Sequence, residues 1–207
     1  GALGEIREIA SCIDTICVLH TNSFQDGEIK IYAADGMYSR KITCPTFDLT
    51  DCVLLDMNTV YAIDNEDMSI IRFDSSGSVT AQSSYQFRAP RKMCFDGGNL
   101  SVDESDQLRI VILDTTCAVI DSIRAEKPCE TTGDKNSILC SIHSCNDILA
   151  AALDYRGKWI YLYTTAHEIS RRRNVNIKGN VKDIYIDKNS VFLLTTAPRI
   201  YHYDIRN

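Results

Sequence analysis

Five aspartates recur in the sequence, and paired carboxylates are the groups with which glycosidases carry out acid–base chemistry. They are Asp56, Asp64, Asp96, Asp103 and Asp187. All five fall near the ends of predicted strands, at matching places of a repeated pattern, where aspartates commonly accept hydrogen bonds from turn amides. The chain also lacks Gly-x-Ser-x-Gly, a phosphate-binding loop and His-Glu-x-x-His. We therefore expect no catalytic residues and no enzymatic activity.

The segment Cys140-x-x-His143-x-Cys145 has side chains that could ligate a metal ion. In a strand, residues 140 and 143 point to opposite faces, so three converging ligands would require a turn there. The segment reads more simply as a strand of the repeated pattern. We expect neither a metal nor another cofactor.

Basic and aromatic side chains provide a third possible chemistry, the binding of an anionic partner. The basic candidates are Arg88, Arg91, Lys92, Arg156, Lys158, Lys178 and Lys182. The aromatic candidates, which could stack on bases, are Tyr85, Phe87 and Tyr155. Whether they form one surface depends on the elements that carry them.

A short apolar segment recurs five times and indicates the architecture. Its copies begin at Ile29, Ile70, Ile110, Ile160 and Ile200, at steps of about 41, 40, 50 and 40 residues. Such a step is the length of one four-stranded propeller blade. Two further apolar runs precede each copy and a more polar run follows four of them, with turn residues between. An irregular sandwich or barrel also uses short strands, but it gives no reason for one pattern to recur at this interval.

The sequence therefore predicts an all-β fold, a single β-propeller domain over residues 1–207 with about five four-stranded blades. The blades cover approximately residues 5–47, 48–87, 88–128, 137–177 and 178–207. The fifth blade stops after its third strand. Either residues Gly1 to Ile9 supply its outer strand, or the chain is part of a larger ring with blades from a partner or from deleted sequence. The Gly-Ala-Leu-Gly start looks like an expression remnant.

The second and third copies resemble the NHL repeat. The carrying residues are Val60-Tyr-Ala-Ile-Asp64, the turn Asn65-Glu-Asp, Ile70-Ile-Arg-Phe-Asp74 with Gly77, and Leu100-Ser-Val-Asp103 to Arg109-Ile-Val-Ile-Leu-Asp114. Blades four and five lack the first Asp of this pattern, and the Trp-Asp dipeptide of WD-type propellers is absent. The resemblance implies a non-catalytic platform that binds protein or single-stranded RNA on one rim. In tripartite-motif proteins it implies a role as a substrate adapter for ubiquitin transfer.

Alternating strand direction places the basic candidates on one rim, because connections between blades share a face with the turns between second and third strands. They form a basic arc that could contact phosphates or an acidic protein segment. Carboxylates at Glu66, Asp67, Glu104 and Asp106 fall on the same rim and would oppose a polyanion. We expect a protein partner, with single-stranded RNA as the alternative.

Composition suggests an intracellular domain. The net charge is −6, no run is long enough to span a bilayer, and no signal peptide is visible. The nine cysteines lie mostly in predicted strands and without Cys-x-x-Cys spacing, so we expect reduced, buried thiols in the cytoplasm. The run Arg171-Arg-Arg173 is expected to protect an outer edge. Residues Glu126 to Asn136 are expected to form a long loop.

Overall fold

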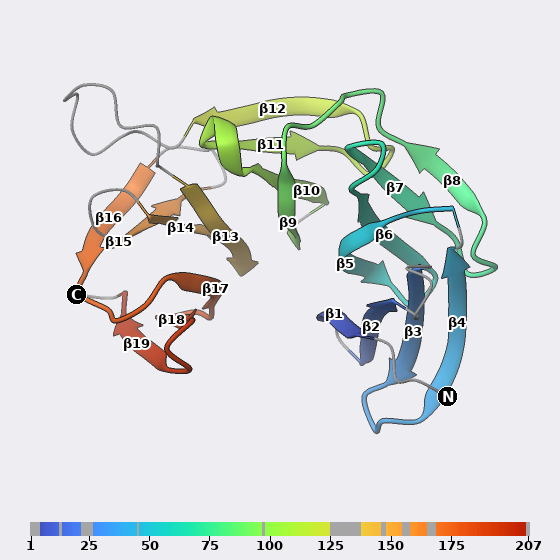
Figure 1. The fold of residues 1–207 in the computed structure, drawn as a ribbon, viewed down its shortest axis with the longest axis horizontal. Helices are drawn as coiled ribbons and strands as arrows, with labels where there is room; N and C mark the ends of the chain where they lie inside the picture. Colours follow the sequence, from blue (N-terminus) through green and yellow to red (C-terminus); the bar gives the residue numbers. More distant parts are fainter. Residues whose placement is uncertain are drawn as a thin grey trace.

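The computed structural model describes residues 5–12, 14–21, 27–44, 46–96, 98–124, 138–145, 148–154, 158–164 and 169–205. These residues form nineteen strands, arranged in five small antiparallel sheets, and one short 3-10 helix. Figure 1 shows the sheets as successive blades around a common centre. The predicted all-β propeller is confirmed. Within this part of the chain, no helix has the length and apolar character needed to cross a bilayer.

The first three sheets are complete four-stranded meanders. The first sheet contains β1 (Glu5–Cys12), β2 (Thr15–Thr21), β3 (Gly27–Ala33) and β4 (Tyr38–Cys44). The second contains β5 (Leu49–Asp56), β6 (Thr59–Asp64), β7 (Ser69–Phe73) and β8 (Val79–Gln82). The third contains β9 (Pro90–Asp96), β10 (Asn99–Glu104), the helix η1 (Ser105–Gln107), β11 (Arg109–Leu113) and β12 (Val119–Arg124).

The fourth sheet repeats this plan, and the fifth has one strand fewer among the described residues. The fourth contains β13 (Ile138–Cys145), β14 (Ile148–Asp154), β15 (Lys158–Tyr163) and β16 (Ile169–Val175). The fifth contains β17 (Val181–Ile186), β18 (Ser190–Thr195) and β19 (Ile200–Asp204). Strand β19, the last copy of the repeat, is therefore an edge strand in this part of the chain.

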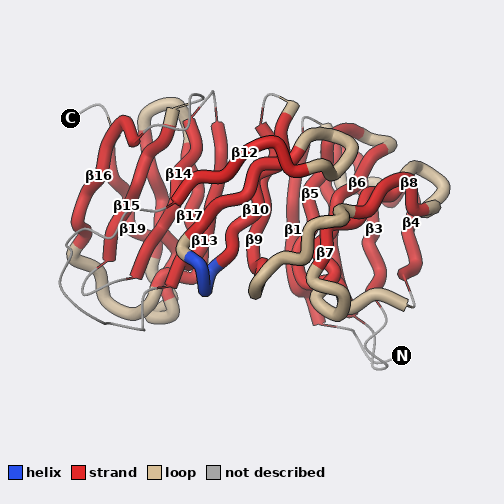
Figure 2. Tube along the Cα trace, turned by 90° about the horizontal axis from the view of Figure 1, so that it is seen from above, coloured by secondary structure: helices blue, strands red, loops and turns tan. Residues whose placement is uncertain are grey.

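The first strand of each sheet lines the centre of the propeller. Strands β1, β5, β9, β13 and β17 pack side by side in this order (Figures 1 and 2). The option that the first residues complete the fifth blade is wrong for residues 5–9, because β1 pairs with β2 in the first sheet. Its apolar residues belong to the repeat itself. Residues 1–4 lie outside the described part.

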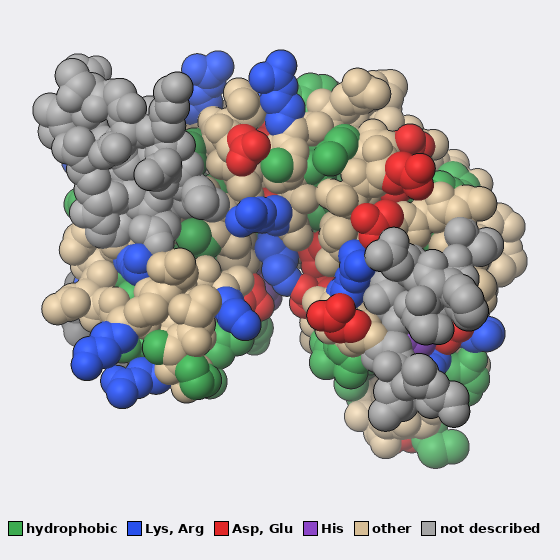
Figure 3. Space-filling model, in the orientation of Figure 1, with side chains coloured by type: hydrophobic (Ala, Val, Ile, Leu, Met, Phe, Trp, Pro, Cys, Tyr) green, Lys and Arg blue, Asp and Glu red, His purple; other side chains and the backbone are tan. Residues whose placement is uncertain are grey.

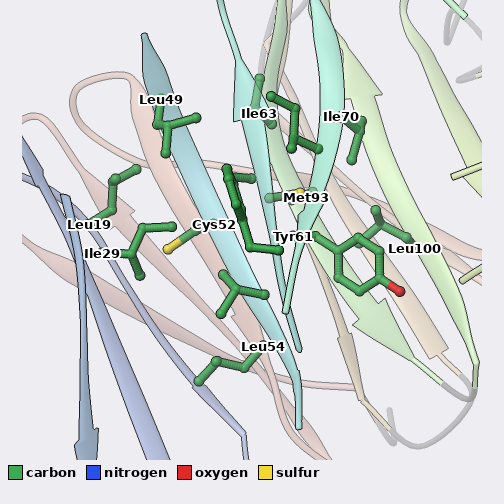
Figure 4. Close-up of a cluster of buried hydrophobic side chains, with 14 of the residues drawn as sticks. Leu19, Ile29, Leu49, Cys52, Leu54, Tyr61, Ile63, Ile70, Met93 and Leu100 are labelled. Atoms are coloured by element: carbon green, nitrogen blue, oxygen red, sulfur yellow. The ribbon is translucent and has the colours of Figure 1, made fainter. Parts of the chain in front are cut away.

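Side chains between adjacent sheets form the core. Leu19 and Ile29 of the first sheet face Leu49 and Cys52 of β5 (Figure 4). Tyr61 of β6 is fully buried, and its hydroxyl donates a hydrogen bond of 2.9 Å to the carbonyl oxygen of Thr115 in the third sheet. The blades are therefore joined by apolar side chains, and successive residues of each strand point to the two opposite faces of its sheet.

The repeat aspartates stabilise turns, as the sequence predicts. Asp74 Oδ1 accepts hydrogen bonds from the amides of Ser76 and Ser78, and Gly77 completes this turn with a φ of +84°. Asp114 accepts from the amides of Thr116 and Ala118 in the same way. Outside this pair of turns, Asp56, Asp64 and Asp187 also accept amide hydrogen bonds from residues two positions later. These carboxylates are thus engaged with the backbone.

The five sheets form an arc in which the first and the fifth lie at the two ends (Figure 1). Among the described residues, β1 and β17 do not pack against each other as neighbouring inner strands do. The space-filling view shows a hollow between the two ends (Figure 3).

Candidate interaction surface around the central channel

A cavity of about 430 Å³ lies at the centre of the arc. Its lining comes from the inner strands of all five sheets, β1, β5, β9, β13 and β17. The lining includes both polar residues, such as Asp51 and Lys92, and apolar ones, such as Phe95 and Tyr185. This channel brings together side chains from every sheet, and the candidate site lies around it.

Five polar side chains occupy one equivalent position on the inner strands. We call them the polar belt: Glu8, Asp51, Lys92, Ser141 and Asp183. Each lies at a β-bulge, where the pairing of the inner strand with the second strand of the sheet shifts. Four of these shifts are recorded on the inner strand, between residues 6 and 8, 49 and 51, 139 and 141, and 181 and 183. In the third sheet the shift is recorded on the second strand, between residues 102 and 104, opposite Pro90 to Met93. Such bulges re-aim side chains and bend the strand. The belt places polar groups at the same level around the channel.

Lys92 connects the first three blades within the belt. Its ammonium forms an ion pair with Glu8 and lies 3.7 Å from Asp51 Oδ1. Asp51 is almost fully buried, and its Oδ2 accepts a hydrogen bond of 2.7 Å from the amide of Met93. Burial disfavours the charge on Lys92, but the carboxylates of Asp51 and Glu8 outweigh it and raise the pKa of the ammonium. Lys92 therefore stays charged beside Glu8, while burial raises the pKa of the Asp51 carboxyl well above its usual range.

Blades four and five are connected by uncharged donors. The Ser141 hydroxyl donates to Asp183 Oδ1 at 2.7 Å. Farther along the same strands, His143 Nδ1 accepts a hydrogen bond of 3.4 Å from the amide of Ile186, and its ring packs 4.6 Å from that of Tyr185. Burial lowers the pKa of His143. A neutral imidazole suits this acceptor role.

The expectation that Asp103 accepts from turn amides is wrong, because its carboxyl group instead holds the bulge of β9 from the neighbouring strand. Its Oδ1 accepts hydrogen bonds of 2.8 Å from the amides of Arg91 and Lys92, whereas Oδ2 is buried without a partner. Burial raises the pKa of this carboxyl to about 6, against the opposing effect of the two amides. The carboxylate thus satisfies backbone donors that the bulge releases from the ladder.

Three cations mark the rim of the channel, each directly before a residue of the polar belt. They are Arg7, Arg91 and Lys182, on the first, third and fifth inner strands. Arg7 is paired with Asp48 at 3.0 Å, whereas Arg91 and Lys182 are exposed. Figure 3, which views the molecule along the channel, shows Lys and Arg side chains beside the hollow with Asp and Glu among them.

The structure brings together only part of the predicted basic arc. Arg88 and Lys178 are exposed on the segments that lead into β9 and β17, and Arg91 and Lys182 are exposed at the second position of these strands. Lys158 is half-buried at the start of β15. Tyr155 and Arg156 lie outside the described residues. The exposed cations therefore cluster at the entries of two inner strands.

Lys92 and Phe87 require corrections to the predicted site. Lys92 points into the channel and pairs with Glu8, because it follows the bulge of β9. Phe87 is 3% exposed and belongs to the core between blades, so it is not available to stack on a base.

Tyr85 and Glu104 also have structural partners. The Tyr85 hydroxyl donates to Glu104, and the Arg109 guanidinium lies over its ring at 5.6 Å. Glu104 is buried and accepts from the amide of Arg88 at 2.8 Å, so it does not stand on the rim as a free carboxylate. This cluster anchors the segment that leads into β9.

The run Arg171-Arg-Arg173 contacts the next blade. Arg171 donates a hydrogen bond to the carbonyl oxygen of Ile205, and Arg173 lies 5.4 Å from the ring centre of Tyr203. These two arginines share a face of β16, as strand alternation requires. They connect the outer strand of blade four to blade five, in addition to any effect on edge pairing.

Cysteines contribute to the core. Five of the eight described cysteines are buried. Cys17 and Cys52 meet across the joint of the first two blades with their sulfurs 3.4 Å apart. Within the described part of the chain, no three potential ligands gather to hold a metal ion. Cys129 and the predicted loop from Glu126 to Asn136 lie outside the described residues.

Comparison with known proteins supports the fold. No family model matches the sequence, and no curated protein matches it. Among solved structures, the crystal structure of the computationally designed Ika8 protein matches with a TM-score of 0.67 at 13% sequence identity. The match covers 99% of this chain and 60% of that chain. At this identity the similarity establishes the propeller fold alone.

Proposed function

We propose that this propeller is a non-catalytic interaction module that binds an acidic segment of a protein partner on the rim of its channel. The observation that carries the proposal is the exposure of Arg88, Arg91, Lys178 and Lys182 where β9 and β17 begin. Arg91 and Lys182 directly precede Lys92 and Asp183, which line a cavity large enough to admit side chains of a bound segment. Charge complementarity of this kind steers a partner and fixes its orientation.

A protein is favoured over RNA by the side chains that accompany the cations. Binding of single strands without sequence preference relies on aromatic platforms, and here Phe87 is buried while Tyr85 is engaged by Glu104 and Arg109. Exposed carboxylates at Glu66, Asp67 and Asp106 lie in the turns of the second and third sheets. They would repel a long polyanion but leave room for a short acidic segment.

The absence of catalysis is part of the same proposal. Asp56, Asp64 and Asp187 accept hydrogen bonds from turn amides. The buried carboxyl groups of Asp51 and Asp103 accept from amides of strand β9. Such groups have structural tasks. A relation to NHL propellers, and with it an adapter role in ubiquitin transfer inside the cell, rests on the repeat residues from Val60 to Gly77 and from Leu100 to Asp114.

The test compares two anionic probes by fluorescence anisotropy at two salt concentrations. One probe is a labelled ten-residue polyglutamate peptide, and the other is a labelled ten-nucleotide polyuridylate RNA. The rim variant carries Arg91→Glu and Lys182→Glu. The matched control carries Arg124→Glu and Arg172→Glu, which change the net charge equally on the exposed outer strands β12 and β16.

We expect micromolar peptide binding that weakens with salt, disappears in the rim variant and persists in the control. If the RNA binds more tightly than the peptide and its binding is also lost in the rim variant, the proposed partner would be RNA in place of protein. Binding of neither probe, or equal loss in the two variants, would refute the rim as an anion-binding surface.

A further inference from the structure

The two ends of the arc expose apolar side chains that every internal blade buries. On the inner strands, two positions are equivalent to Ile6 and Ile9: Leu49 and Cys52, Pro90 and Met93, Leu139 and Ile142, Val181 and Ile184. All eight of these residues are buried. In β1 itself, Ile6 is 61% exposed and Ile9 is 58% exposed. The repeat supplies the same side chains, but among the described residues no blade packs on this face of β1.

The opposite end shows the complementary face. In the first four blades the leading isoleucine of the repeat, at position 29, 70, 110 or 160, is buried in a core cluster that includes residues of a neighbouring blade. Ile200, the fifth member, is 72% exposed. Its cross-strand partner Leu194 is 42% exposed, whereas the equivalent Leu19 of the first blade is fully buried.

We propose that these two end faces are docking surfaces for at least one further propeller blade, supplied by a partner module that closes the ring. The face of β1 with Ile6 and Ile9 would receive the last added blade. The face of β18 and β19 with Leu194 and Ile200 would pack against the first. Each contact would repeat the joint seen between Leu19, Ile29, Leu49 and Cys52 (Figure 4).

A second copy of this chain does not fit the same faces as well. Two arcs joined at both ends would place ten sheets in one ring, whereas propellers typically have four to eight blades. The match to the Ika8 chain leaves 40% of that chain outside the aligned part, since it covers 60% of it. The fold shared with this protein therefore also occurs within a longer chain.

Apolar surface at both ends is also unfavourable for an isolated molecule. Exposed patches of this kind mark interaction sites or promote association, and β19 presents an unpaired edge among the described residues. A joining blade would cover the two isoleucines of β1 and Ile200 together, and a fourth strand would pair with β19. The proposal is independent of what the rim binds.

The first experiment extends the full chain with its own blades. After Asp204, one variant continues with residues 75–124, which supply a fourth strand and one sheet, and another with residues 34–124, which supply a fourth strand and two sheets. Ile200→Asp and Ile6→Asp are then introduced into the original and the extended chains. The equilibrium constant for urea unfolding is measured for each.

In the original chain we expect each aspartate to change this constant by less than about twofold, because the site is exposed. In the extended chain that closes the ring, we expect each to cost more than about tenfold, because a charge is buried without a partner. Equal effects of these substitutions in the original and both extended chains would overturn the proposal.

A second measurement uses the original chain alone, in case the extended chains do not fold. We expect it to bind the dye ANS, and the double variant Ile6→Lys with Ile200→Lys to lose most of that fluorescence. The control, Met37→Lys with Val79→Lys, replaces exposed apolar residues away from the end faces and should retain it. Equal fluorescence in both variants would refute the exposed faces. A dimer in sedimentation that dissociates in the double variant would make the occupant a second copy and overturn the proposal.

Discussion

The joint between blades two and three and the joint between blades four and five solve one packing problem with different chemistry. In the first, the Asp51 carboxylate accepts a hydrogen bond from the amide of Met93 and lies near the Lys92 ammonium. In the second, the hydroxyl of Ser141 donates to Asp183. Asp51 and Ser141 occupy the same position of the repeat, but one accepts across the joint and the other donates.

This difference shows that the repeat requires a polar side chain at this position but allows its chemical type to vary from blade to blade. A bulge at this position releases backbone groups from the ladder, so a polar side chain is required nearby. In the joint of Asp51 and Lys92, which we call the charged joint, an ammonium and buried carboxyl groups depend on one another. In the joint of Ser141 and Asp183, which we call the hydroxyl joint, a half-buried carboxylate accepts from an uncharged hydroxyl. We therefore expect the charged joint to be sensitive to loss of a single partner, and the hydroxyl joint to be tolerant.

The largest effect is expected from removal of the cation in the charged joint. Lys92→Met leaves Glu8 and Asp51 without a counter-ion and should lower the free energy of unfolding by about 3–5 kcal/mol. Ser141→Ala in the hydroxyl joint should cost about 1 kcal/mol. Urea unfolding at pH 7 measures both. Equal losses from the two variants would show that the joints do not differ as their chemistry indicates.

A smaller contrast is expected between an internal joint and an end face. Ile70→Ala removes a fully buried side chain from the second blade and should cost about 2–5 kcal/mol. Ile200→Ala changes the equivalent exposed residue of the fifth blade and should lie within about 0.5 kcal/mol of the parent chain. Thermal and urea unfolding of both variants check this. A large cost at Ile200 would mean that the end face is covered in solution.

The pH dependence of stability provides the most delicate comparison. Asp103 opposes the bulge of the charged joint, with a pKa raised to about 6, while Ala152 takes the equivalent place opposite Ser141. Because the native state binds this proton more tightly than the unfolded chain, stability should fall by up to about 3 kcal/mol as pH rises from about 4 to 6. Asp103→Asn keeps the acceptor for both amides and should flatten this part of the curve.

Unfolding of the wild type and of Asp103→Asn is compared at pH 4, 5, 6 and 7. Asp51 and the exposed carboxylates are common to both proteins, so the difference between the two curves isolates Asp103. An unchanged slope in Asp103→Asn would contradict the assignment of this titration to Asp103.

The sequence predicts the fold well because each copy of the repeat has apolar residues at the same positions, and these positions indicate which strand residues are buried. The leading isoleucines and the turn aspartates recur at a nearly constant step, and both take the expected places. The same periodicity could have revealed the polar belt, since Glu8, Asp51, Lys92, Ser141 and Asp183 also recur at about this step. Their different chemistry hid the relation.

Positions in connecting segments are harder to predict. Phe87 follows strand β8 in a loop, where strand alternation no longer indicates which side a residue faces, and it turns into the core. Lys92 follows a bulge, which shifts the alternation by one residue and directs the side chain to the channel. The exposure of Ile6 and Ile200 depends on which blades pack against them. The sequence of one repeat does not indicate how many blades the ring contains.

The separation of β1 from β17 has a topological consequence. A ring whose first and last blades are in contact admits a polymer only through its two openings, whereas an arc is also open along one side. The joining of the last blades would therefore decide when the channel becomes enclosed.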